Sequence, residues 1–375
     1  MTSSEDQAIG LICKKCFHRA LWLPQTANHR RLRVTYSTTT NFDNVSLPVI
    51  FFIPPMFGCR WNALHFNKLA NDCGVRVIFV DRPGFGGSTP VTLDIRVAVW
   101  LETVPVLLHQ LGVEHVSIVT HSAGTIYTLN TLIRYRDILD PKMPYVAFMA
   151  PFVPKAYSGA TVPSLASKLP TNALDAWAGI NSFVNNKIMP SVSWSGGLIS
   201  PLSNVFSSSA GTEVPGAEAS NSTTLVEQYG FDKDTAKVIQ KFATKWQFAE
   251  PNEGGNEEAK LCLQKCDDAA WVEAADYSGC IRKIADNEGA LSGSKDAPGV
   301  AKLKVDSFFA GSDMMIAKRG QAYFEQCWQG DEVSGKVDFV TSTYPEANHD
   351  SLLVDYKKGA LKDVFERVAR LSRNG

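Results

Sequence analysis

The stretch Val119-Thr120-His121-Ser122-Ala123-Gly124 joins a short apolar run to a segment that favours a helix. Val116 to Thr120 is typical of a buried strand and Ala123 to about Tyr135 of a helix, so Ser122 falls on the turn between them. A serine at such a sharp corner presents its hydroxyl at the carboxyl end of the strand, and small neighbours leave room for the backbone. The stretch predicts a nucleophilic serine, and an ordinary helix N-cap serine is the alternative.

The chain around this stretch alternates between strands and helices, as expected of a parallel sheet covered on both faces. The expected strands are Leu47 to Ile53, Val75 to Val80, Val116 to Thr120, Tyr145 to Met149, Leu303 to Ala310 and Lys336 to Ser342. The expected helices are Trp61 to Cys73, ended by Gly74, Val97 to Leu111, bent by Pro105 and ended by Gly112, Ala123 to Tyr135, Met315 to Cys327, and a closing helix from Ser351 to Leu371.

The alternation is interrupted between residues 154 and 300. Roughly 150 residues are too many for an ordinary connection, so the sequence predicts an inserted subdomain. We expect one amphipathic helix at Ile239 to Trp246, another at Ala259 to Ala270, and an exposed loop at Phe206 to Thr223. The predicted organisation is a core part at 1–153, an inserted lid or cap at 154–300, and a second core part at 301–375.

Composition narrows the function classes. The chain has 375 residues, of which 45% are hydrophobic and 20% charged, with a formal net charge of -1. The hydrophobic fraction and the near-zero net charge exclude a disordered polyanion, and the absence of excess positive charge argues against nucleic acid as the main partner. The most apolar run, Leu47 to Gly58, is shorter than the 18 or so residues of a membrane span. Glu5 and Asp6 precede the first apolar patch, which Lys14 and Lys15 interrupt, so we expect no secretory signal and a cytoplasmic location.

The eight cysteines suit a reducing compartment. Cys13 and Cys16 with His18 invite a zinc or redox interpretation, but no second C-x-x-C motif completes four ligands. The sequence therefore does not predict a metal.

Two motifs give the chain a resemblance to a known family. The elbow resembles that of the α/β-hydrolase family, G-x-S-x-G, with Thr120 where the first glycine is usual. Asp81-Arg82-Pro83-Gly84-Phe85-Gly86-Gly87-Ser88 follows a strand and is very similar to the family's D-x-x-G-x-G-x-S loop. A phosphate-binding turn is excluded because no Lys-Ser or Lys-Thr pair follows. The resemblance implies a mostly parallel sheet flanked by helices, with a large, mainly helical lid between the sixth and seventh strands.

The resemblance also implies positions for the catalytic groups. Ile53-Pro54-Pro55-Met56-Phe57-Gly58 stands where the family usually carries His-Gly, which assigns the oxyanion hole to the N–H groups of Met56 and Ala123. In the family's order of serine, acid and histidine, the base lies after Ser122. His349, in Tyr344 to Asp350, is the one histidine of seven that does so. It would remove the hydroxyl proton.

The acid is expected after the penultimate strand, where Asp313 follows Phe308 to Ser312. Asp350 is interpreted as solvated, and Asp306 lies inside a strand pattern. We also expect substrate contacts by Phe57, His121, Trp177 and Trp194.

These residues predict a serine hydrolase that cleaves an ester or related acyl bond without metal or organic cofactor. The expected substrate is a small apolar molecule. Its bulky apolar acyl or alcohol group is favoured by the aromatic share of the insertion, although these residues also suit the core of the insertion itself: Trp177, Phe183, Trp194, Phe206 and Trp246. An aspartate at the elbow would indicate an epoxide hydrolase or dehalogenase, and Ser122 excludes that version. The alternatives are an acyltransferase, lyase or cyclase with the same triad, or a non-catalytic binding protein on this fold.

Overall fold

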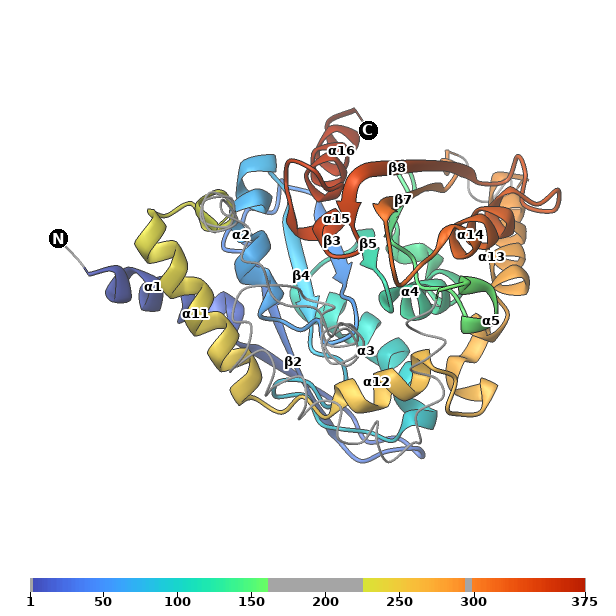
Figure 1. Cartoon of the computed structure of the whole chain (residues 1–375). Helices are drawn as coiled ribbons and strands as arrows, with labels where there is room; N and C mark the ends of the chain where they lie inside the picture. The colour runs from blue at the N-terminus through green and yellow to red at the C-terminus, as the bar shows by residue number, and fades with distance from the viewer. Residues whose placement is uncertain (1–2, 161–224, 294–298, 375) are drawn as a thin grey trace, which may run out of the picture.

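One mixed sheet of eight strands forms the centre of the computed structural model (Figure 1), which describes residues 3–160, 225–293 and 299–374. The strands are β1 (Arg19–Leu23), β2 (Leu32–Thr38), β3 (Val49–Ile53), β4 (Arg76–Val80), β5 (Ser117–His121), β6 (Tyr145–Met149), β7 (Lys304–Ser312) and β8 (Asp338–Asn348).

The strand order is β1-β2-β4-β3-β5-β6-β7-β8. The pairs β1–β2 and β2–β4 are antiparallel, and every later pair is parallel. The order reverses at β3, which lies between β4 and β5. In open α/β sheets, ligands bind at such a reversal, outside the carboxyl ends of the strands.

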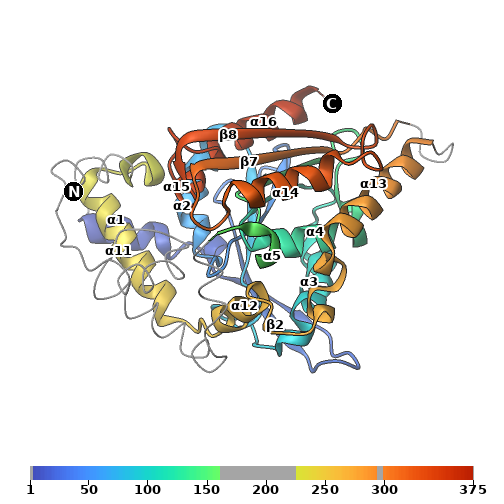
Figure 2. The ribbon, with the colours of Figure 1, turned by 45° about the vertical axis from the view of Figure 1, so that its right-hand side comes forward.

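Helices cover both faces of the sheet. In Figure 2, α16 and α14 lie on opposite sides of β7 and β8. On one face α16 packs against α2, and on the other α4 contacts α3 and α13. The helices are α1 (Ser4–Ile12), α2 (Asn62–Cys73), α3 (Arg96–Leu111), α4 (Gly124–Arg134), α5 (Lys155–Ser158), α11 (Lys233–Ala249), α12 (Gly254–Cys262), α13 (Tyr277–Gly293), α14 (Lys318–Gln329), α15 (Ser351–Val354) and α16 (Leu361–Asn374). Short 3₁₀ helices are η1 (Lys15–Phe17), η2 (Leu93–Ile95), η3 (Arg136–Ile138) and η4 (Asp268–Ala275).

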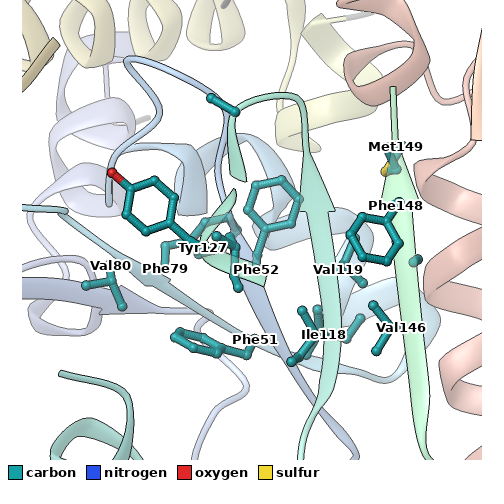
Figure 3. Close-up of a cluster of buried hydrophobic side chains, with 14 of the residues drawn as sticks. Phe51, Phe52, Phe79, Val80, Ile118, Val119, Tyr127, Val146, Phe148 and Met149 are labelled. Carbon is teal, nitrogen blue, oxygen red and sulfur yellow. The ribbon is translucent and has the colours of Figure 1, made fainter. Parts of the chain in front are cut away.

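The core is built on the central parallel strands. All five residues of β3 and of β6 are buried, which explains their continuous apolar sequence. Figure 3 shows side chains from β3, β4, β5 and β6 packed as one cluster, among them Phe52, Phe79 and Phe148. Phe51 of β3 stacks on Trp100 of α3 with ring centroids 5.4 Å apart. The expected α/β architecture, with a mostly parallel sheet flanked by helices, is confirmed.

Several elements differ from the prediction. The hairpin of β1 and β2 was not predicted. β8 continues to Asn348 instead of ending at Ser342, because it is an exposed edge strand whose polar side chains and Pro345 read as a loop. The closing helix is interrupted after Val354, where Asp355 Oδ1 accepts hydrogen bonds from the N–H groups of Lys357 and Lys358 and turns the chain.

The chain between β6 and β7, residues 150–303, is called the β6–β7 segment below. Its described helices include α5, α11, α12, η4 and α13, and α11 lies beside α1 in Figures 1 and 2. The second amphipathic helix is shorter than predicted, because α12 ends at Cys262 and Gln264 has a left-handed φ of 52°. The predicted loop at Phe206 to Thr223 lies outside the described residues. Within the described ranges, no helix combines the length and apolarity needed to cross a bilayer.

Candidate active site

Ser122 occupies a strained turn between β5 and α4. Its φ of 51° lies in the left-handed region, which a residue with a side chain rarely adopts. Gly124 is required because a Cβ there would lie 2.5 Å from Ile53 O and 2.4 Å from Thr120 Oγ1. The Thr120 hydroxyl donates a hydrogen bond of 3.2 Å to Ile53 O, so the threonine in place of the usual glycine joins the elbow to β3.

The predicted oxyanion loop begins beside this elbow. β3 and β5 are parallel neighbours with Ile53 opposite Thr120, so the residues that follow each strand emerge at the same edge. Met56 and Ala123 are buried, at 5% and 2% exposure. In the described part of the chain, neither of their N–H groups has a hydrogen-bond acceptor. N–H groups of buried residues without acceptors are unusual in a folded protein, and these two suit a site that binds an oxyanion.

Asp313 and His349 meet at the end of another strand pair. Ser312 of β7 pairs with Asn348 of β8, so the next residue of each strand reaches the same place. Asp313 Oδ2 lies 2.8 Å from His349 Nδ1, and both side chains are about 5% exposed or less. The other carboxylate oxygen accepts hydrogen bonds of 2.8 Å from the N–H groups of Met315 and Ile316. The carboxylate is therefore held on both oxygens.

The two side chains shift one another's pKa in opposite directions. Burial opposes protonation of His349, but the charge and hydrogen bond of Asp313 outweigh it and raise the pKa of His349. Burial likewise opposes ionisation of Asp313, yet the charge and hydrogen bonds of His349 and the backbone N–H groups lower the pKa of Asp313. The carboxylate is thus ionised near neutral pH and accepts the Nδ1 proton, which leaves Nε2 of the neutral imidazole as a base.

His121 contacts His349 through its backbone and its ring. Burial lowers the pKa of His121 to about 3, so its ring is neutral near pH 7. Its Nε2–H donates a hydrogen bond of 2.9 Å to His349 O, and the two ring centroids are 4.8 Å apart. The residue next to Ser122 in sequence therefore contacts His349 directly. His121 was predicted to contact substrate, but its side chain is fully buried against His349.

The His349 Nε2 atom is buried and, within the described residues, has no hydrogen-bond partner. No hydrogen bond to Ser122 Oγ is present. Hydrogen bonds of this kind are often long or misaligned before substrate binds.

The remaining residues considered from the sequence are two groups: the expected substrate contacts Phe57, Trp177 and Trp194, and the cysteines Cys13 and Cys16. Phe57 is buried and packs edge-on against Phe85, and a Cβ on Gly255 of α12 would lie 2.0 Å from its ring. The space beside Phe57 is thus filled by α12. Trp177 and Trp194 lie outside the described residues. Cys13 and Cys16 are free thiols.

Two other carboxylates, those of Asp306 and Glu346, have different partners from Asp313. Asp306 is buried and accepts a hydrogen bond of 2.7 Å from the Tyr145 hydroxyl, and Arg367 also contacts it. Glu346 is exposed, with a lysine Nζ 3.3 Å away.

Two charged residues near the site were missed. Arg82, in the Asp81 to Ser88 loop, contacts the carbonyl groups of Pro54 and Pro55. Glu258 of α12 pairs with Arg82. A glutamate on the apolar side of a helix, one turn before Cys262, was the sequence signal for a buried charge.

A family model described as the alpha/beta hydrolase family matches residues 50–250, more than half of the 375-residue chain. No curated protein matches the chain significantly.

Solved structures resemble this fold at low identity. One, from work on carboxylesterases of the thaumarchaeon Nitrososphaera gargenis, is 11% identical with a TM-score of 0.52, and the match covers 95% of this chain and 100% of that one. Epoxide hydrolase A from Mycobacterium thermoresistibile is 12% identical with a TM-score of 0.51, over 94% and 98% of the two chains. Epoxide hydrolase VrEH1 from Vigna radiata is 14% identical with a TM-score of 0.50, over 96% and 98%. These likenesses concern the fold, and the match to the family model shows that the chain belongs to the alpha/beta hydrolase family.

Proposed function

We propose that this chain is a serine hydrolase that cleaves an ester bond of a small apolar substrate through an acyl-enzyme intermediate. The observation that carries the proposal is the buried 2.8 Å contact between Asp313 Oδ2 and His349 Nδ1. The contact fixes the tautomer of the imidazole, so that Nε2 can act as a base. The loop that carries His349 also contacts the elbow of Ser122, because the His121 ring hydrogen-bonds to His349 O.

In the proposed first step, His349 Nε2 takes the proton of the Ser122 hydroxyl while Oγ forms a bond to the acyl carbon. The carbonyl electron pair moves onto oxygen, and the N–H groups of Met56 and Ala123 stabilise that negative charge. The alcohol leaves when the tetrahedral intermediate collapses, and it takes the proton from His349.

In the second step, water replaces the alcohol. His349 removes a proton from the water as its oxygen bonds to the acyl carbon, and a second tetrahedral intermediate forms. Its collapse releases the carboxylic acid and returns the proton to Ser122 Oγ. Asp313 keeps its charge throughout and stabilises the imidazolium formed in each step.

The residue at the elbow favours ester hydrolysis over epoxide opening, although epoxide hydrolases are among the structures of similar fold. In this family, epoxide opening relies on an aspartate nucleophile, which the hydroxyl of Ser122 does not provide.

Labelling with a fluorophosphonate probe tests the proposal. We expect the wild-type chain to be labelled and to hydrolyse small aryl esters. Ser122→Ala should remain folded, lose labelling and lose about 10⁴- to 10⁶-fold in kcat. Ser117→Ala, in the same strand, is the matched control and should keep both properties. Labelling or hydrolysis retained in Ser122→Ala would contradict the assignment of the nucleophile.

Aryl esters from acetate to octanoate extend the same experiment to the substrate class. The aromatic residues of the β6–β7 segment favour a bulky apolar acyl or alcohol group, so kcat/KM should rise with chain length. Acetate turned over as efficiently as octanoate would show that the binding pocket is not apolar.

A further inference from the structure

The Arg82 guanidinium contacts the predicted oxyanion loop through two backbone carbonyl groups. Its Nη1 donates a hydrogen bond of 2.6 Å to Pro54 O, and its Nη2 donates one of 2.6 Å to Pro55 O. Arg82 is fully buried, at 0% exposure. A planar fork of N–H donors can hold two consecutive carbonyl groups at once, which a single lysine amine cannot do with the same geometry.

The contact with Pro55 O bears directly on the Met56 N–H. The two groups belong to one planar trans peptide unit, in which the C=O and N–H point in opposite directions. When Arg82 fixes the direction of the carbonyl, it therefore fixes the direction of the N–H. A positive charge at the oxygen also polarises the peptide and makes its N–H a stronger donor.

Glu258 of α12 holds the Arg82 side chain in this position. Arg82 contacts the carboxylate through Nε and through Nη2, the latter at 2.8 Å. Arg96 Nη2 lies 3.2 Å and the Tyr127 hydroxyl 3.1 Å from Glu258 Oε1. Glu258 is 1% exposed. Its removal would leave two arginines buried without their carboxylate partner, and Arg82 would lose the group that sets its orientation.

We propose that Arg82 and Glu258 are positioning residues for the oxyanion hole, with Glu258 acting through Arg82 and Arg82 acting through the Pro55–Met56 peptide. The β6–β7 segment would then take part in catalysis through a side chain that never touches substrate. This inference rests on the acyl-transfer chemistry proposed above, since an oxyanion must form for the Met56 N–H to matter.

Three variants separate this role from simple structural support. Arg82→Lys keeps a positive charge beside Glu258 but cannot hold both carbonyl groups. Glu258→Gln keeps the shape of the side chain and removes its charge. Glu288→Gln is the matched control, because Glu288 is a 1% exposed carboxylate of α13 that joins the same segment to the core through Arg136, away from the loop.

Steady-state kinetics with an aryl ester provide the first readout. Arg82→Lys and Glu258→Gln should lower kcat about 10- to 100-fold while KM stays within about threefold, because the lost interaction forms with the oxyanion and not with the bound ester. A trifluoromethyl ketone, to which Ser122 Oγ adds to give an oxyanion, should lose affinity by the same factor as kcat. Glu288→Gln should lower the melting temperature and leave kcat unchanged.

Hydrogen exchange of Ile53, Met56, Phe57 and Gly58, the residues of the loop that carry an amide proton, provides a readout that needs no activity. The amides of this loop should exchange faster in Arg82→Lys and Glu258→Gln than in the wild type, and at the wild-type rate in Glu288→Gln. Unchanged exchange overturns the positioning role, and so does a kcat within about twofold of wild type in folded Arg82→Lys and Glu258→Gln. If the wild type neither reacts with the probe nor hydrolyses esters, the proposed function falls, and the exchange rates still decide whether Arg82 orders the loop.

Discussion

The protonation state of His349 governs the proposed chemistry. Its ring lies between a carboxylate that raises its pKa and a neutral, fully buried His121. The charge of Asp350 also raises the pKa of His349, by less than Asp313 does. Only the unprotonated ring can accept the Ser122 proton, so activity depends on the balance between these neighbours and burial.

The pH dependence of kcat/KM should reflect this balance. Because the pKa of His349 is raised, the ring becomes protonated, and activity is lost, at a higher pH than for an ordinary histidine with a pKa of about 6.5. Asp313→Asn removes the charge that raises this pKa, so the acidic limb should move to lower pH. The same variant should lower kcat by up to about 10⁴-fold, because the imidazole tautomer is no longer fixed. Profiles measured with a small aryl ester test both expectations.

Asp350→Asn and Glu346→Gln are the controls for this experiment. Glu346 is exposed, so its loss should leave kcat near wild type. Asp350→Asn should shift the acidic limb only slightly, since the Asp350 charge is the smallest of the causes that raise the pKa. A large loss of kcat in either variant, with kcat of Asp313→Asn near wild type, would show that the acid lies in another loop than the one that carries Asp313.

Among the elements, the ends of two strand pairs deliver the chemical groups. β3 and β5 end beside one another and carry the Met56 loop and Ser122. β7 and β8 end beside one another and carry Asp313 and His349. Adjacent parallel strands end at the same edge of a sheet, so the register alone brings each pair together. His121 then connects the two pairs through His349 O.

The junction of β3, β5 and α4 should tolerate no side chain at Gly124. A Cβ there would lie 2.5 Å from the backbone oxygen of Ile53, which cannot move without shifting β3. We expect Gly124→Ala to lower the free energy of unfolding by about 1–3 kcal/mol or more and to reduce activity. Urea denaturation followed by circular dichroism measures the change.

Gly10→Ala is the matched control, because Gly10 lies in α1 and a Cβ there meets nothing within 4 Å. It should be neutral or stabilising by up to about 1 kcal/mol. Equal stability of Gly124→Ala and wild type would mean that the elbow packs less tightly than described.

Across the whole molecule, arginines of the core hold the β6–β7 segment through glutamates. Arg60 pairs with Glu250, Arg82 with Glu258, and Arg136 with Glu288. Glu258 and Glu288 are almost completely buried, and loss of one partner of such a pair typically costs about 3–5 kcal/mol. At the other end of the molecule, α1 packs against α11. The segment is therefore attached to the core at several separate places.

This attachment predicts one cooperative unfolding transition. Fluorescence and circular dichroism should give the same urea midpoint, and the slowest amides of α12 and α13 should exchange with the same opening free energy as those of β3 and β5. Native-state hydrogen exchange measures the two groups together. Opening of α12 and α13 at several kcal/mol less than the central strands would show that the segment unfolds independently.

The parallel core could be predicted from the sequence because its signals are local. β3, β4, β5 and β6 are apolar runs separated by helical patterns, and each lies where the sequence places it. The elbow and the order of Ser122, Asp313 and His349 follow from motifs in the chain. The edge strands were harder, since β8 is exposed and carries polar residues and Pro345. A strand that packs only one face, or neither, lacks a continuous hydrophobic signature.

The sequence by itself was enough to predict which residues carry the proposed chemistry, because the proposed nucleophile, base and acid each follow a recognisable strand. Only the tertiary structure decided how they are held. The contacts of Arg82 with Pro55 O and Glu258, and of His121 with His349 O, join residues separated by 27 to 228 positions. No local pattern encodes such pairs: a buried charge or ring acquires its partner only when the strands and the β6–β7 segment have packed, since burial is what makes that partner necessary.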